Sequence, residues 1–319
     1  MNHLINNRNL TTFNALEQEL SLQTNKNYLF DLSYLSVIDV IGDKTLEFLQ
    51  GQLTCNVNTI SDIQIAQGTL CNLQGRVLTL MDVVNWSGIK LILPKDLLEA
   101  TIKSLNKPAM LSRVTTKENQ HLCVLGFYLQ NQQDMVPDTS FFPTELYALT
   151  YGKDYCCYHL GSGFYIFLIQ TDFAAQIKHR FSKQEQLLGS LTWHTFRLQQ
   201  KQFDIYPESR GLFLPHRLEL HKTPYLSFNK GCYKGQEIIA RMHYKATLKH
   251  ELRICSVNTN EKIHSGQKLL NEQCSELGEL IDYSPQGENN YLIAVSILKN
   301  SNQLVVFENS NTPIYLKRL

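Results

Sequence analysis

Strand-sized and helix-sized apolar runs are mixed along this chain without regular alternation, and this mixture constrains the fold most. A doubly wound parallel sheet requires strands and helices in strict turn, so the pattern predicts an α+β fold instead. We expect helices over residues 12–24, 43–50, 95–106, 172–188 and 193–202, the second of them capped by Asp43 and ended by Gly51. We expect strands over residues 34–40, 123–129 and 165–170, two strand-like runs between 66 and 93, and a loop over 131–145.

The chain changes character near residue 247. From about Leu252 to Leu319, short alternating runs are broken by turn residues, which is typical of a small antiparallel β-domain. We therefore predict two domains, residues 1–246 and 247–319. Within the first, residues 206–230 hold three prolines and few regular patterns. Long irregular segments of this kind are usually functional.

Composition excludes several classes of function. The 30 basic and 29 acidic residues leave a net charge of +1, so no global field attracts nucleic acid or an anionic membrane. No run approaches the ~20 apolar residues of a membrane helix. The first ten residues are polar and lack the apolar core of a signal peptide. We expect a cytoplasmic protein that binds neither membrane nor nucleic acid directly.

Eight cysteines occur, and none forms a C-x-x-C pair. Zinc-ribbon and cluster-ligand spacings are therefore absent, and no metal site is predicted. In a cytosolic chain of this size we expect reduced thiols. Cys156 and Cys157 are adjacent and would point to opposite faces of a strand, so we interpret them as packing residues rather than a redox pair.

Chemistry is concentrated in one run from Lys230 to Arg241, with the sequence KGCYKGQE followed by IIAR. Two glycines frame Cys232 and Tyr233, and a polar pair then opens an apolar stretch that suits a helix start. Lys230 and Lys234, together with the helix N-terminus, would favour a thiolate at Cys232. The run is either a turn with a structural cysteine or a loop that presents a reactive thiol, and its pattern favours the thiol.

The same run resembles the signature of the YgfZ family, folate-binding proteins related to the T-protein (aminomethyltransferase) of the glycine cleavage system. A stretch from Gly42 through FLQGQLT to Val57 resembles a second family motif, and residues 71–76 resemble the strand that follows it. The resemblance implies an aminomethyltransferase-like ring of three lobes around a folate channel, with a C-terminal antiparallel β-barrel. The motif residues that carry it are Lys230, Gly231, Cys232, Tyr233, Gly235, Gln236, Glu237 and Arg241.

The resemblance also implies a folate site. Trp193 would be a platform for the pterin, although a lone tryptophan is more commonly a core aromatic. Arg197, one helical turn later, would contact the glutamate tail, or would form a surface salt bridge. Leu35 stands where the family has an aromatic contact, so that ring is missing here and Tyr34 or Tyr28 could supply a face instead.

Catalysis by aminomethyl transfer is not favoured. T-proteins carry an acidic pair shortly after the glycines of a related motif, because the reaction needs a positioned acid or base. Counted from Gly75, Thr79 and Leu80 occupy those positions here. Asp82 lies two residues further on, on the face of Leu80 if the segment is a strand, and could substitute only if the register slips. Whether the chain is an enzyme is therefore left open, with the balance against it.

Two further groups near the cysteine run invite interpretation. Arg241 could support the thiolate, but an i,i+4 pair with Glu237 is favoured. Four histidines flank the run, and their spacing matches no standard metal pattern, so surface or packing roles are favoured. A Cys232–His243 catalytic couple lacks any third-member or oxyanion signal. The four are His216, His221, His243 and His250.

The resemblance implies a tetrahydrofolate-binding accessory protein that supports iron–sulfur cluster assembly or repair and iron–sulfur-dependent tRNA modification. Cys232 would be its functional thiol, and iron–sulfur enzymes or assembly proteins its partners. An aminomethyltransferase of the glycine cleavage type is one alternative, and a cysteine-dependent folate enzyme is another. No G-x-G-x-x-G fingerprint supports a flavin oxidase.

Overall fold

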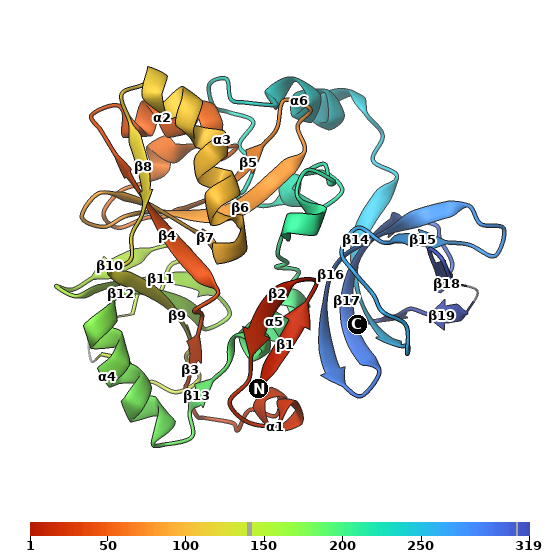
Figure 1. Ribbon diagram of the computed structural model, residues 1–319, viewed down its shortest axis with the longest axis horizontal. Helices are drawn as coiled ribbons and strands as arrows, with labels where there is room; N and C mark the ends of the chain where they lie inside the picture. The colour runs from red at the N-terminus through yellow and green to blue at the C-terminus, as the bar shows by residue number, and fades with distance from the viewer. Residues whose placement is uncertain (139–141, 311) are drawn as a thin grey trace.

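The computed structural model describes residues 1–138, 142–310 and 312–319, and it mixes helices and strands as the sequence predicted. Figure 1 shows three lobes arranged around a central region. We call them the first lobe, built on a five-stranded sheet; the second lobe, built on a six-stranded sheet; and the C-terminal lobe, built on a seven-stranded sheet.

The first lobe is an antiparallel sheet in the order β5-β6-β7-β4-β8, with helices over one face. Its strands are β4 (Leu35–Ile41), β5 (Ala66–Cys71), β6 (Val77–Asn85), β7 (Ile89–Pro94) and β8 (Thr115–Glu118). Its helices are α2 (Thr45–Gln52) and α3 (Leu98–Leu111), with short 3-10 turns at η1 (Val57–Thr59) and η2 (Lys95–Leu97). Apolar side chains of α2 and α3, such as Phe48 and Leu105, share one buried cluster with this sheet.

The second lobe is a sheet in the order β10-β11-β12-β9-β3-β13, covered on its outer face by α4. Its elements are β3 (Tyr28–Asp31), β9 (Leu122–Tyr128), β10 (Leu149–Tyr151), β11 (Tyr155–Gly161), β12 (Phe164–Gln170), α4 (Thr171–Ser182) and β13 (Leu187–Leu188). Its inner face packs against the first lobe through a cluster that includes Phe30, Val37, Ile92 and Ile166. The two lobes therefore form four layers, with helices outside and sheets inside.

The N-terminal segment and the segments between the second and C-terminal lobes lie outside the three sheets. These elements are β1 (Asn2–Ile5), β2 (Arg8–Thr11), α1 (Leu16–Leu20), α5 (Ser190–Gln199), η3 (Pro207–Ser209), η4 (Leu220–Lys222) and α6 (Gln236–Lys245). Figure 1 shows β1, β2 and α5 at the centre, α6 at the top and α1 at the bottom. Residues 206–230 are irregular apart from η3 and η4, as expected. The hairpin packs on the C-terminal lobe through Ile5 and Leu10.

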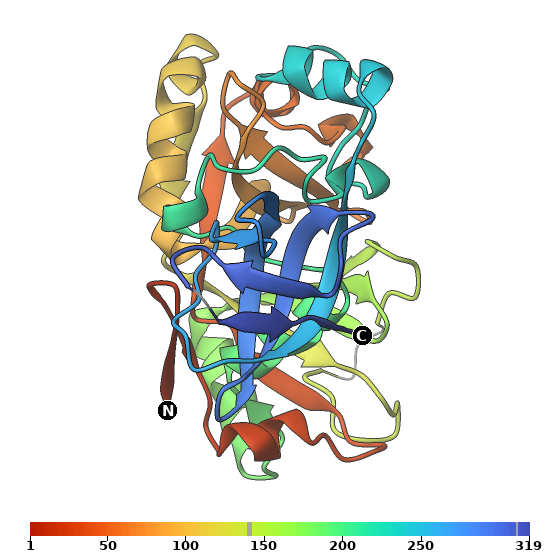
Figure 2. The same ribbon diagram turned by 90° about the vertical axis from the view of Figure 1, so that its right-hand side faces the viewer.

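The C-terminal lobe is an antiparallel sheet in the order β19-β18-β15-β16-β17-β14-β20, and Figure 2 shows it from the front. Its strands are β14 (His250–Asn258), β15 (Lys268–Leu270), β16 (Glu276–Gly287), β17 (Asn290–Leu298), β18 (Leu304–Phe307), β19 (Pro313–Tyr315) and β20 (Lys317–Arg318). The antiparallel prediction is confirmed, but the barrel is not: the sheet curls into a half-barrel and its edge strands β19 and β20 do not pair. The domain boundary at residue 247 stays a prediction.

Two expected helices are shorter than their periodicity predicted. The helix expected over 12–24 is only α1, because the Glu19 side chain turns inward and accepts hydrogen bonds from the backbone of Phe13, Asn14 and Gly189. The helix expected over 172–188 ends at Ser182, and its last residues instead pair with β3 as β13. Tertiary partners outweighed weak local preference in both places.

The remaining differences are local. Residues 66–93 form three strands rather than two, since the run is interrupted both around Gly75 and at Ser87 and Gly88. Asp43 makes no side-chain cap, and the helix that follows runs through Gly51 to Gln52. The helix expected over 95–106 begins at Leu98 and continues past Pro108 to Leu111, and that expected over 193–202 spans 190–199. Of the loop expected over 131–145, residues 139–141 lie outside the described residues.

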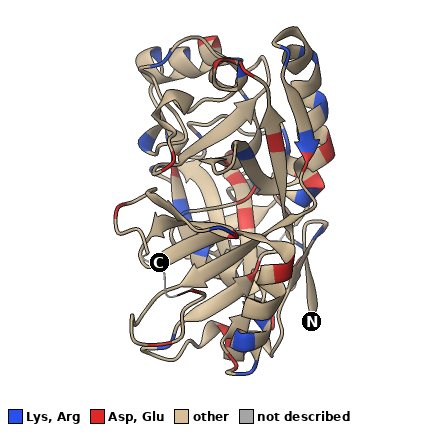
Figure 3. Ribbon diagram, turned by 90° about the vertical axis from the view of Figure 1, so that its left-hand side faces the viewer, with Lys and Arg blue, Asp and Glu red and all other residues tan. Residues whose placement is uncertain are grey.

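Charges of both signs are interspersed over the face shown in Figure 3, in agreement with the near-zero net charge. No described helix is both long enough and apolar enough to span a bilayer.

Candidate functional site

A cavity lies where the first lobe, the second lobe and α5 meet. The space within it is about 650 Å³, counting the part open to solvent. All four residues predicted to contact folate line it: Tyr34, Leu35, Trp193 and Arg197. Tyr28, the other tyrosine considered, is instead buried in the core between the two sheets. That the four residues contact folate stays a prediction.

Trp193 is both a core residue and part of the cavity wall. Only 4% of it is exposed, and the rings of Phe30 and Phe164 lie 5.3 Å from the indole. Its ring also packs closely against β9, since a Cβ on Gly126 would lie 2.5 Å from the indole. The indole is therefore held rigidly in one orientation before any ligand arrives.

Arg197 and Asp82 bring opposite charges to the same cavity. Burial lowers the pKa of Arg197, whose guanidinium donates a hydrogen bond to the Gln200 side chain at 3.1 Å. Burial raises the pKa of Asp82, although Gln67 and Tyr158 donate hydrogen bonds to its two oxygens at 2.9 and 2.7 Å. The cavity thus offers a poorly solvated cation and a fixed carboxyl to a polar ligand.

The position of Asp82 refines the argument about the missing acidic pair. In β6, Leu80 pairs with Thr69 and Asp82 with Gln67, so both side chains face the cavity without any slip of register. Thr79 points the other way and is buried. An acid therefore stands at the cavity, two residues beyond the predicted positions.

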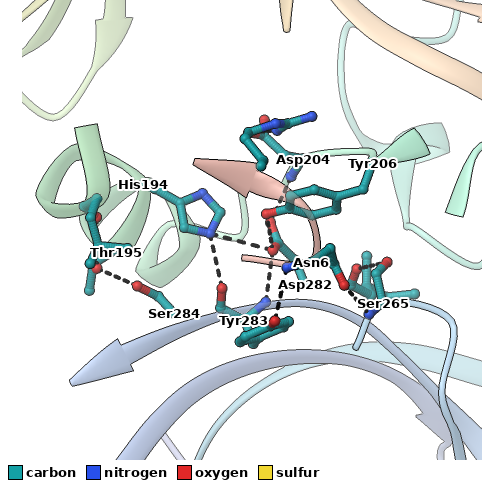
Figure 4. A network of polar contacts seen from close by, with 12 residues as sticks. Asn6, His194, Thr195, Asp204, Tyr206, Ser265, Asp282, Tyr283 and Ser284 are labelled. Atoms are coloured by element: carbon teal, nitrogen blue, oxygen red, sulfur yellow. Dashed lines mark hydrogen bonds and ion pairs between the residues drawn. The ribbon is translucent and has the colours of Figure 1, made fainter. Parts of the chain in front are cut away.

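A buried polar network forms the wall of the cavity nearest the C-terminal lobe (Figure 4). His194 and Asp204 line the cavity, and behind them Asp282 on β16 accepts hydrogen bonds from the Tyr206 hydroxyl at 2.6 Å and the Asp204 amide at 2.8 Å. Arg8 on β2 donates to Asp204 at 2.6 Å and binds Asp96 through two nitrogens. These groups join the hairpin, the first lobe and the C-terminal lobe at one point.

The cysteine run is anchored to the second motif of the resemblance. The Lys230 ammonium donates to the backbone carbonyls of Gln50, Leu53 and Cys55, at 2.6 to 2.8 Å. Burial lowers the pKa of Lys230 to about 8. Its charge is therefore directed at the end of α2 and not at the thiol of Cys232, as the sequence had suggested.

Two glycines allow a close backbone contact between the cysteine run and the turn after β5. Gly235 has a φ of +84°, and a Cβ there would lie 2.5 Å from the Asn72 carbonyl oxygen. Gly75 opposite it has a φ of +69° and contacts Ile239 and Gly235. All three stretches that carried the family resemblance thus meet in one place.

Cys232 and Gly231 remain outside this packing. Cys232 is exposed, and a Cβ on Gly231 would meet no atom within 4 Å. Cys232 is not among the residues that line the cavity. The expected Glu237–Arg241 pair is wrong: the ion pairs of the described residues do not include it, and both side chains are exposed.

Three of the four flanking histidines gather beside the run. The rings of His216 and His221 stack at 4.9 Å, His243 stacks on Phe228 at 3.7 Å, and His216 lies 6.1 Å from His243. His216 is buried, and neither of its ring nitrogens has a hydrogen-bond partner. Over the described ranges, no group of three histidine, cysteine or acidic side chains is arranged to hold a metal ion.

His216 is expected to make the protein acid-sensitive. Burial and the charges of His221 and His243 lower the pKa of His216 to about 4, against ~6.5 for an unfolded chain. Its neutral form therefore stabilises the fold fully above pH ~6.5, and this contribution is lost as the pH falls toward 4. The free energy of unfolding is measured in urea at pH 7 and at pH 4.5. Between these two values it should fall by about 2 kcal/mol less for His216→Leu than for wild type. His121→Leu, at an exposed site, is the control; an equal loss in wild type and His216→Leu would contradict the expectation.

The other cysteines are packing residues with one exception, the exposed Cys274. Cys156 and Cys157 lie in β11, are both buried, and belong to the clusters on opposite faces of the sheet. Burial raises the pKa of both thiols.

Sequence reasoning missed the network around Asp282. Its members come from β2, from the loop after α5 and from β16, and no spacing connects them. The only local signal was His194, next to Trp193 on the same helix.

Comparison with known proteins bears on the family and the fold. No family model matches the chain. Three proteins named tRNA-modifying protein YgfZ are similar to it. That of Colwellia psychrerythraea is 26% identical over 296 residues, which cover 89% of each chain. That of Vibrio atlanticus is 24% identical over 272 residues (83% of this chain and 82% of the relative), and that of Pectobacterium carotovorum is 22% identical over 302 residues (91% of this chain and 90% of the relative).

Among solved structures, the glycine cleavage system aminomethyltransferase T of Bartonella henselae superposes with a TM-score of 0.69 at 13% sequence identity. The match covers 100% of this chain and 93% of that one. The α+β fold with three lobes is therefore that of aminomethyltransferase T. Together with the curated relatives, it confirms the resemblance that the motifs indicated, and this chain is similar to the YgfZ proteins along most of its length.

Proposed function

We propose that this chain is a folate-binding accessory protein that supports iron–sulfur-dependent tRNA modification, with tetrahydrofolate in the cavity against Trp193 and Cys232 as the functional thiol. One observation carries the folate assignment. Four residues from two separate segments, Tyr34 and Leu35 in one and Trp193 and Arg197 in the other, were implicated by resemblance alone, and all four line one cavity.

The chemistry of the cavity suits a pterin with an acidic tail. An indole edge and aliphatic side chains such as Leu80 and Ile166 suit a flat heterocycle, and the Asp82 carboxyl suits its ring N–H groups. Arg197 and His194 supply donors for carbonyl or carboxylate oxygens.

Cys232 acts at a separate place in this proposal. The fold uses Lys230, Tyr233 and Gly235 for packing. It leaves Cys232 exposed on a loop that is held from both sides. Such a thiol is accessible to a protein partner or to a cluster in transit, and iron–sulfur proteins are the partners we propose. The tRNA assignment rests on the names of the relatives, and the near-zero net charge favours a role through protein partners rather than through direct tRNA binding.

The proposal is tested by calorimetry with tetrahydrofolate on wild type and Cys232→Ser, with methylthiolation of tRNA measured by mass spectrometry in cells that carry each variant. We expect Cys232→Ser to bind folate within twofold of wild type and to lose the modification. Absence of folate binding by wild type would refute the folate assignment. Weakened folate binding by Cys232→Ser would contradict the separation of cavity and thiol.

The presence of Asp82 in the cavity favours one alternative, a tetrahydrofolate-dependent aminomethyltransferase. Both oxygens of that carboxyl already accept hydrogen bonds from Gln67 and Tyr158. These bonds suit a group that orients a ligand better than one that exchanges protons. Formation of methylenetetrahydrofolate from an aminomethylated lipoyl donor would establish the alternative.

A further inference from the structure

His194 has one ring nitrogen bound by the C-terminal lobe and one that is not. Its Nε2 lies 3.1 Å from the Tyr283 carbonyl oxygen and 3.4 Å from Oδ1 of Asp282. Both partners are acceptors, so Nε2 carries a hydrogen. In Figure 4 the other nitrogen, Nδ1, is turned away from Asp282 and makes no bond within the network. His194 lines the cavity, whereas Asp282 does not.

Asp282 is held in place independently of the histidine. The side chain is fully buried. Oδ1 accepts from the Tyr206 hydroxyl at 2.6 Å and from the backbone N–H of Tyr283 at 2.7 Å, and Oδ2 accepts from the backbone N–H of Asp204 at 2.8 Å. A carboxylate that accepts three hydrogen bonds from fixed donors is held rigidly in one orientation.

The charged groups around the ring decide its protonation. Asp204 lies on the loop after α5 and forms an ion pair with Arg8 of β2. Arg197 lies on α5, the helix that also carries His194, and lines the same cavity. Burial alone would lower the pKa of His194, but Asp282, Asp204 and the Tyr283 carbonyl raise it to about 9. At neutral pH the ring is therefore charged, and Nδ1 also carries a hydrogen with no acceptor in the network.

We propose that Nδ1–H of His194 binds an acceptor oxygen of the cavity ligand, a ring carbonyl or a carboxylate, and that Asp282 is the positioning residue that keeps this ring charged and correctly turned. The inference rests on the proposed folate site and deepens it. It makes the C-terminal lobe a determinant of folate affinity, although none of that lobe's residues lines the cavity.

The test is calorimetry with 5-formyltetrahydrofolate, a stable probe, between pH 6.5 and 9.5. The variants are Asp282→Asn and the matched control Ser284→Ala. Ser284 is also buried on β16, and its hydroxyl lies 2.6 Å from that of Thr195 on α5. The control therefore breaks a contact between the same two elements without touching His194.

At pH 7.5 we expect Asp282→Asn to bind about tenfold more weakly than wild type, because a charge-assisted hydrogen bond becomes a neutral one. Ser284→Ala should stay within twofold. Wild-type affinity should hold steady to pH ~8.5 and fall above pH 9 as the ring loses its proton. In Asp282→Asn the carboxylate no longer raises the pKa of His194, whereas burial still lowers it. The fall in ligand affinity should therefore begin at a lower pH than in wild type.

His194→Gln keeps a donor toward Tyr283 but lacks Nδ1. It should bind about tenfold more weakly than wild type with no fall near pH 9, and it tests the inference if Asp282→Asn does not fold. Wild-type affinity and pH profile in either variant would overturn the role of the pair while leaving the folate site intact. Absence of binding by wild type at every pH would instead refute the folate site itself.

Discussion

Replacement of Arg197 by methionine is expected to weaken tetrahydrofolate binding by about 100-fold, because loss of one partner of a desolvated charge pair costs several kcal/mol. Arg197 lines the cavity and is only 9% exposed, and its guanidinium donates a hydrogen bond to Gln200. Burial lowers its pKa, so the charge is poorly compensated within the protein. Under the proposed function, an anionic group of the ligand would pair with this charge.

Stability should respond in a different way from affinity. Replacing a buried, incompletely paired charge by an apolar side chain of similar length is often neutral or stabilising. We therefore expect the unfolding free energy of Arg197→Met to stay within about 1 kcal/mol of wild type. Arg217→Met is the control, since it removes an arginine paired with Glu279 outside the cavity. It should leave the affinity unchanged. Retention of affinity within threefold by Arg197→Met would exclude the residue from the site.

Replacement of Gly235 by alanine is expected to destabilise the fold by about 3 kcal/mol, through strain at a left-handed backbone and collision with a backbone atom. Its φ is +84°, and the added Cβ would lie 2.5 Å from the carbonyl oxygen of Asn72. Neither the turn after β5 nor the start of α6 can yield without losing the contact between them. Urea unfolding monitored by circular dichroism measures the effect.

Gly231→Ala is the matched control in the same run. Open space surrounds its position, so the expected change in stability is within about 0.5 kcal/mol. If Gly231→Ala nevertheless impairs tRNA modification in cells, the loop around Cys232 must be approached closely by a partner. Equal stability losses in the two variants would show that the division of the run into packing and exposed residues is wrong.

The cysteine run and the cavity are distinct parts of the molecule joined by short structural links. The Thr54 hydroxyl, next to the carbonyl of Leu53 that holds Lys230, donates to the carbonyl of Tyr225, and Tyr225 lines the cavity. The wall of the cavity and the loop that carries Cys232 are therefore linked through Tyr225, Thr54 and Lys230. This arrangement agrees with a protein in which folate binding and thiol function are separate but connected.

Much of the local structure was predictable from the sequence because its signals are local. The strand expected over 34–40 is a short run of mostly β-branched and apolar residues, and the helix after Gly235 begins where a polar pair follows a glycine. The N-terminal hairpin was missed, since its two four-residue strands carry little pattern of their own. Their apolar residues Ile5 and Leu10 are buried only by the C-terminal lobe.

The candidate site divides in the same way. The sequence alone determined the α+β class, the family resemblance, the presented cysteine and the residues proposed to bind folate, because each rests on neighbours within a few positions. Only the tertiary structure decided that Asp82 faces the cavity, that Arg197 is buried beside it, and that His194 is held by Asp282. The physical reason is that burial and electrostatic fields arise from residues far apart in the chain, and folding alone brings those residues together.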